Sequence, residues 1–134
     1  MPPDKLVPLP GVVEGPPEPF AWAIEVLQEA VAELQEFLGD GAEVRLESGL
    51  GGGLGIEILV VVKVPSINYR EVIFRALIAP SGKPARLDFF GTERLPSCAT
   101  AAELSAAIST QFGSEDNQSH LAMLYRLARQ SAVR

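Results

Sequence analysis

The longest apolar stretch of the chain, residues 55–64, reads GIEILVVVKV. Side chains alternate between the two faces of an extended chain, so one face of this stretch is wholly aliphatic. That face carries Ile56, Ile58, Val60, Val62 and Val64, and the other carries Glu57, Leu59, Val61 and Lys63. The β-branched residues and two apolar residues in the middle of the second face predict a central strand.

Three further stretches alternate in the same way, at 42–48, 69–79 and 85–90. Their predicted inward residues are Val44 and Leu46, then Val72, Phe74, Ala76 and Ile78, then Leu87 and Phe89. The sequence PSGKP at 80–84 supplies the residues that a tight reversal needs between the last two. Four strands in succession predict an antiparallel meander.

Apolar residues at steps of three and four predict a first helix over 19–38, with Gly39 as its C-terminal cap. The stripe consists of Phe20, Ile24, Leu27, Val31, Leu34 and Leu38. We expect this stripe to pack on the sheet.

Thr100-Ala101-Ala102-Glu103 matches a capping box and predicts the start of a second helix, which Gly113 ends. A last helix is predicted from Glu115 to about Ala132. The inward residues are Leu104, Ile108 and Phe112 in the second helix, and Leu121, Leu124, Tyr125 and Ala128 in the third. The predicted fold class is therefore α+β, with an N-terminal helix, a four-stranded antiparallel meander and two C-terminal helices.

Residues 1–19 contain seven of the eleven prolines, which bias the backbone away from regular hydrogen bonding. The segment also carries aliphatic residues, which a free polar tail would lack. We predict a Pro-rich arm over 1–18, laid on the body or on a partner, and a single domain over 19–134. A mobile terminus is the alternative.

The net charge of −6 argues against binding to nucleic acid or to an anionic membrane, because both require a basic surface. Residues 1–40 hold eight acidic side chains against Lys5, which gives −7, and the remainder holds nine acids and ten bases, which gives +1. A single cysteine and the absence of a secretory signal pattern predict a cytoplasmic location.

The outer surface of the first helix carries Glu25, Glu29, Glu33 and Glu36 without any lysine or arginine in that helix. Like charges at i,i+4 repel, so something outside the helix should compensate them. Three interpretations are open: a solvated acidic face, compensation by the arginines of the last helix, and a docking surface for a basic partner.

His120 and Cys98 are the only histidine and the only cysteine, so zinc sites and His-carboxylate metal clusters are not predicted, nor is any cofactor. A Cys98–His120 dyad is conceivable, because Cys98 precedes a helix start that can lower a thiol pKa. A buried structural cysteine is the simpler interpretation. The glycine-rich loop at 49–55 fits no phosphate-binding motif and leads into a strand. No catalytic residue is assigned.

The second face of the sheet presents an apolar centre inside a charged rim, which is the composition of a protein interface. Its predicted apolar members are Leu59, Val61, Ile73, Leu77 and Phe90. A partner, a second copy or the Pro-rich arm could cover it. Alternatively, the first helix covers this face and the last two helices cover the other, as three layers.

The leading hypothesis is a non-enzymatic protein-interaction module, such as an adaptor, inhibitor or accessory subunit. It would bind a protein partner, or itself as a homodimer, through the outer sheet face, the Pro-rich arm and the acidic residues Glu25, Glu29 and Glu33. The alternative is a small-molecule-binding domain or enzyme with a pocket near the glycine-rich loop and Cys98. A third hypothesis is an acidic nucleic-acid mimic.

Overall fold

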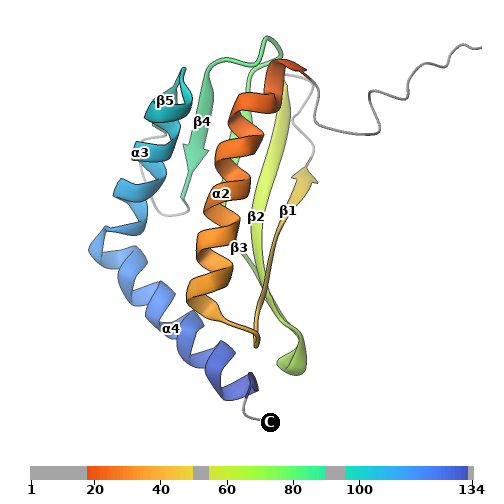
Figure 1. Ribbon diagram of the computed structural model, residues 1–134, viewed down its shortest axis with the longest axis vertical. Coiled ribbons are helices and arrows are strands. Elements are labelled where there is room, and N and C mark those ends of the chain that lie inside the picture. Colours follow the sequence, from red (N-terminus) through yellow and green to blue (C-terminus); the bar gives the residue numbers. More distant parts are fainter. Residues whose placement is uncertain (1–17, 50–54, 90–95, 133–134) are drawn as a thin grey trace, which may run out of the picture.

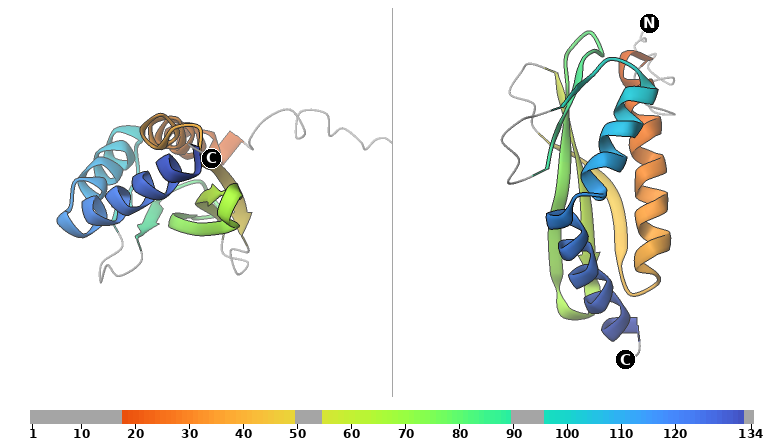
Figure 2. Two further views of the ribbon diagram at one scale, coloured as in Figure 1. Left: turned by 90° about the horizontal axis from the view of Figure 1, so that it is seen from below. Right: turned by 90° about the vertical axis from the view of Figure 1, so that its left-hand side faces the viewer.

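All three α-helices lie on one face of an antiparallel sheet whose strands run in the order β1-β2-β3-β4-β5 (Figures 1 and 2). The computed structural model describes residues 18–49, 55–89 and 96–132, and these statements concern that part of the chain. The elements are η1 (Glu18–Phe20), α2 (Ala21–Leu38), β1 (Glu43–Gly49), β2 (Ile56–Val64), η2 (Pro65–Ile67), β3 (Tyr69–Ile78), β4 (Ala85–Asp88), β5 (Ser97–Cys98), α3 (Ala101–Phe112) and α4 (Glu115–Ala132).

Strand β2 is an interior strand of the sheet and pairs with β1 on one side and β3 on the other. Its aliphatic face is buried under the helices: Val60, Val62 and Val64 are fully buried in the same core cluster as residues of α2, α3 and α4. Burial of each such side chain stabilises the fold by about 1.5–3 kcal/mol relative to exposure. The apolar stretch at residues 55–64 therefore forms the sheet side of the hydrophobic core.

A bulge in the pairing of β2 with β3 shifts, partway along β3, which of its side chains point toward the helices. Val60 pairs with Phe74 but Val61 pairs with Val72, which leaves Ile73 as the extra residue. Simple alternation predicted Val72 on the helix side and Ile73 on the outer side. The bulge reverses both: Val72 shares the outer face with Val61, and Ile73 belongs to the buried core cluster.

Helix α2 is fixed at both ends by polar contacts. Near its start, Nε1 of Trp22 donates to the carbonyl of Gly82 at 2.9 Å. Gly82 has a φ of 94°, and a Cβ there would meet the carbonyl oxygen of Pro19 at 2.0 Å, so the turn needs glycine. Near the end of α2, the Gln35 side chain bonds the carbonyls of Gly39 and Ala42 and the amide of Val44. These bonds set the angle at which the chain enters β1.

Three phenylalanines join the sheet to the end of α3. The rings of Phe74 and Phe89 stack with centroids 4.4 Å apart, and Phe112 meets them edge-on at 5.8 and 5.6 Å. Such pairs are worth about 0.5–1.5 kcal/mol beyond the area they bury. This cluster fixes where α3 stops and α4 turns away.

The predicted α+β fold and element order are confirmed. The structure adds a fifth strand, β5, which pairs Cys98 with Ala85. The three-layer alternative is not found among the described residues, because α2 lies on the same face as α3 and α4 (Figure 2). The stripe of α2 is also rotated from prediction: since α2 packs on two helices as well as the sheet, its buried residues are Ala23, Val26, Leu27, Ala30, Leu34 and Leu38.

The Pro-rich arm over 1–18 lies outside the described residues apart from Glu18, so its predicted placement stays a prediction. Phe90 and residues 50–54 of the glycine-rich loop also lie outside them.

The capping box of α3 gives a stability prediction. Oγ1 of Thr100 accepts from the amide of Glu103 at 3.1 Å, and Oε1 of Glu103 accepts from the amide of Ala99 at 2.8 Å. Thr100→Ala should therefore lower the free energy of unfolding by about 1 kcal/mol in urea denaturation. The matched control is Thr110→Ala at an exposed position inside α3, where alanine has the better helix propensity. A Thr100 variant as stable as this control would contradict the assignment.

Candidate functional site

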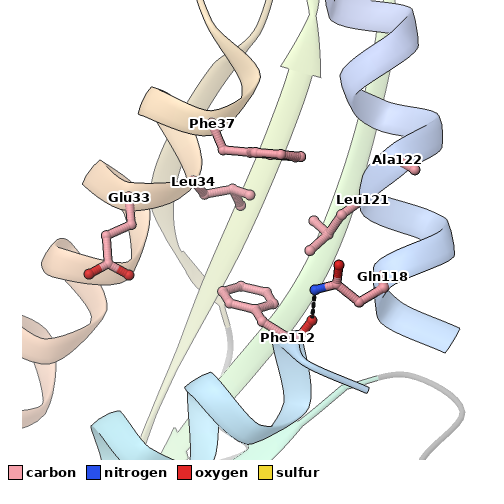
Figure 3. Close-up of a pocket in the computed structure, with 7 residues that line it drawn as sticks. All are labelled: Glu33, Leu34, Phe37, Phe112, Gln118, Leu121 and Ala122. Carbon is pink, nitrogen blue, oxygen red and sulfur yellow. Dashed lines mark hydrogen bonds between the residues drawn. The ribbon is translucent and has the colours of Figure 1, made fainter. Parts of the chain in front are cut away.

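A cavity of about 250 Å³ opens between α2, the end of α3 and α4 (Figure 3). Most of its wall is apolar, and its lining residues are Glu33, Leu34, Phe37, Phe112, Gln118, Leu121 and Ala122. Figure 3 shows Leu34, Leu121 and Phe112 converging from three helices, with the carboxylate of Glu33 pointing away from them. The hollow is thus built by side chains far apart in the sequence.

The walls of this cavity are held by contacts on either side of it. Phe112 is fixed by the phenylalanine cluster, and Nε2 of Gln118 donates to its carbonyl at 2.5 Å. On α2, the Phe37 ring lies 5.2 Å from the Tyr125 ring, over which the Arg129 guanidinium sits at 5.1 Å. Phe37 remains 47% exposed, which is unusual for so large an apolar side chain with a packing partner.

A second, smaller hollow continues the cavity between α2 and α3. Its polar walls come from Glu29 and Glu33 on α2 and from Ser105 and Ser109 on α3. Glu33 lines both hollows, so the two adjoin at this residue of α2. We call the cavity and the smaller hollow together the helical groove.

Glu25, Glu29 and Glu33 form an acidic ridge along the exposed side of α2 beside the helical groove. Successive members are four residues apart, so their Cβ atoms are about 5–6 Å apart. No ion pair in the described part of the chain includes any of them. Among the described residues, the ridge is therefore a row of like charges with no ion-pair partner.

The arginines of α4 do not neutralise the acidic ridge. Arg129 lies over the Tyr125 ring, at the end of α4 that is beside the end of α2. Arg126 is exposed and joins no ion pair with a described residue. Of the three interpretations of the acidic face, compensation by α4 thus has no direct contact to support it.

The outer face of the sheet differs from the helical groove in having its charges paired. Arg75 reaches Glu57 at 2.5 Å and Asp88 at 2.9 Å, and Glu47 accepts from Arg70 at 2.7 Å and faces Lys63 at 3.8 Å. The two carboxylates raise the pKa of Arg75, and the hydrogen bond from Arg70 lowers the pKa of Glu47. Solvent screens each of these surface pairs, and together they span four strands.

Few of the apolar residues predicted for the outer face offer accessible surface. Val61 is fully buried, and Ile73 belongs to the core. Leu59 and Leu77 are partly buried between charged neighbours. Among the described residues, Phe37 and Ile67 are the large hydrophobic side chains that are exposed, and neither lies on this face.

Cys98 and His120 are not brought together as a dyad. Cys98 is 3% exposed in the core cluster, and burial followed by the charge of Glu103 raises the pKa of its thiol, the opposite of activation. His120 on α4 instead faces β3, with its buried Nε2 atom 2.5 Å from Oε2 of Glu71. Among the described residues, neither Cys98 nor the loop residue Gly55 lines the cavity or the smaller hollow.

Within the described residues, no group of three or more His, Cys, Asp or Glu side chains is arranged to hold a metal ion. None of the helices there is long and apolar enough to cross a membrane. Comparison of the chain with protein-family models, curated proteins and solved structures finds no match. The candidate site therefore rests on geometry alone.

Of the predicted partner-binding residues, the structure gathers Glu29 and Glu33 in the helical groove with Glu25 one turn further along. Sequence reasoning missed the apolar part: Phe37, Leu121 and Ala122 come from separate helices, and only tertiary packing brings them together. The sequence contained one signal of this apolar part. Phe37 falls outside the predicted stripe, between Glu36 and the inward residue Leu38, and so is an apolar residue on a charged face.

Tyr69, beside Glu71 and His120 at the edge of the core, gives a pH prediction. Burial, reinforced by a hydrogen bond to Glu71, raises the pKa of Tyr69 from 10.0 to about 12. A raised pKa adds stability that is complete below the unfolded value and is lost as the pH rises through the folded one.

Tyr69→Phe loses the hydrogen bond to Glu71 and should be less stable than wild type at neutral pH. The difference in unfolding free energy should shrink between about pH 10 and 12, because Tyr69 ionises in the unfolded chain before it ionises in the folded protein. Denaturation curves across this range measure it. A difference for Tyr69→Phe that does not change with pH would refute the assigned environment.

Proposed function

We propose that this chain is a non-enzymatic protein-interaction module that binds a protein partner through the helical groove. The observation that carries the proposal is the apolar cavity with half-exposed Phe37 at its rim. Anchoring side chains of a partner fill such pockets at the centre of protein interfaces, and a polar rim surrounds them. Here the rim is supplied by Glu33 and Gln118.

The volume of the cavity favours a side-chain anchor over a small molecule. Small-molecule sites measure about 300–1,000 Å³, and the cavity, at about 250 Å³, is below that range. Its described lining residues include neither a nucleophile nor a paired acid and base that would suggest catalysis. Binding of a small apolar ligand in this same cavity is the second candidate, because the lining is largely apolar.

The helical groove is favoured over the outer sheet face as the docking surface. The outer face pairs its charges across strands, its Val61 is buried, and Ile73 belongs to the core on the other side, so little apolar area is left for a partner to cover. The helical groove exposes Phe37 and leaves Glu33 without an ion pair among described residues. Interface energy comes mainly from buried apolar anchors and fully desolvated pairs.

Photo-crosslinking at two positions tests this proposal. A photoreactive amino acid replaces Ala122 in the cavity or, as the control, the exposed Arg86 on the outer face of β4. In cells of the source organism, position 122 should give a discrete protein adduct and position 86 should not.

The adduct's partner, once identified and purified, should bind the purified chain, and Phe37→Ala should weaken that binding about tenfold or more. Because Phe37 is half exposed, this variant should still fold, which circular dichroism checks. An adduct from position 86 alone would place docking on the sheet. Adducts from neither position would refute the proposal.

A further inference from the structure

The shape of the helical groove indicates what kind of segment fits it. Its described walls are side chains of α2, α3 and α4, and no described residue of a strand lines it with free backbone groups. An extended peptide lying there would leave its own amides and carbonyls unpaired, whereas a helix satisfies them internally. Side-chain ridges of a helix also pack into grooves between neighbouring helices.

The position of the cavity sets where the apolar anchor of such a helix lies. The cavity is at the Leu34 and Phe37 end of the groove, and its volume of about 250 Å³ suits one aromatic or large aliphatic side chain. The polar hollow with Glu29 and Glu33 continues from it along α2. A helix in the groove would thus be apolar at one end of the contact and polar along the next two turns.

The acidic ridge indicates which charge the polar turns of the partner helix should carry. Glu33 and Glu29 follow one another at helical spacing, so a partner helix running along α2 places one residue beside each, about one and two turns from its anchor. Lysine or arginine at these places would supply the cations that Glu29 and Glu33 do not find among described residues.

Charge also excludes two occupants from this chain itself. A second copy docked groove to groove would bring two acidic ridges together, and like charges facing each other across an interface oppose association. Residues 1–17 carry Asp4 and Glu14 against Lys5 alone, so the N-terminal segment has no basic face to offer.

We therefore propose that the helical groove binds a basic amphipathic helix of another protein, with one large apolar side chain in the cavity and lysine or arginine beside Glu33 and Glu29. This inference rests on the proposed function and adds the chemistry of the partner. It would also supply cations to the glutamates of α2, which repel one another at i,i+4 spacing and form no ion pair with a described residue.

A displayed library of helix-forming peptides with randomised surface positions is the probe, selected on the purified full chain. Enriched peptides should carry a large apolar residue with lysine or arginine one and two turns away. The double variant Glu29→Gln/Glu33→Gln should bind them about fivefold more weakly at low salt, since two exposed pairs are worth roughly 1 kcal/mol together.

Glu36→Gln is the matched control, because Glu36 is on the same helix but lines neither hollow, and it should change affinity less than twofold. All these variants should fold, since each removes a like charge from α2. Phe37→Ala should weaken binding about tenfold or more.

Three results would overturn the inference: enrichment of neutral or acidic peptides, peptides that bind Phe37→Ala as well as wild type, and no enrichment over an unrelated acidic protein. None of these three results decides the photo-crosslinking experiment at Ala122, which tests the proposed function independently. An adduct at position 122 whose partner contributes a neutral or acidic segment would retain the proposed function and reject the basic helix.

Discussion

The aliphatic face of β2 has to be kept from water, and the rest of the architecture follows from how this is done. Val60, Val62 and Val64 lie on that face with no polar group among them, so helices must cover it. Three helices gather there, and the opposite face is left to cross-strand ion pairs around Arg75 and Glu47. One face of the sheet is thus the core, and the other is a charged surface.

Placing three helices over one face also creates the candidate site. The α3–α4 turn, where Ser114 and Asn117 bond the carbonyl of Gln111, directs α4 away from the line of α3. Where α4 diverges from α3, the side chains of α2 do not fill the whole space between the helices. A cavity therefore remains between Leu34 and Leu121. The site is therefore a consequence of how the helices cover the sheet rather than of any sequence motif.

Local rules predicted the elements of this fold, because each depends on neighbouring residues. The alternation in β2, the Thr100 capping box and Gly113 all act within a few positions. The features that local rules did not predict depend on contacts between residues distant in sequence. They are the β3 bulge at Ile73, the fifth strand, and the rotated stripe of α2. The acidic half of the candidate site was visible because Glu29 and Glu33 are helical neighbours. Its apolar half, from Phe37 and Leu121, required the tertiary structure.

The central claim is that the helical groove, and not the sheet, is the docking surface. Two variants with the same added bulk test it most directly with the purified cross-linked partner: Ala122→Trp fills the cavity, and Arg86→Trp projects from the outer sheet face. Calorimetric titration should show binding abolished by Ala122→Trp and unchanged by Arg86→Trp, with both proteins folded. Binding that survives Ala122→Trp and is lost with Arg86→Trp would contradict the account.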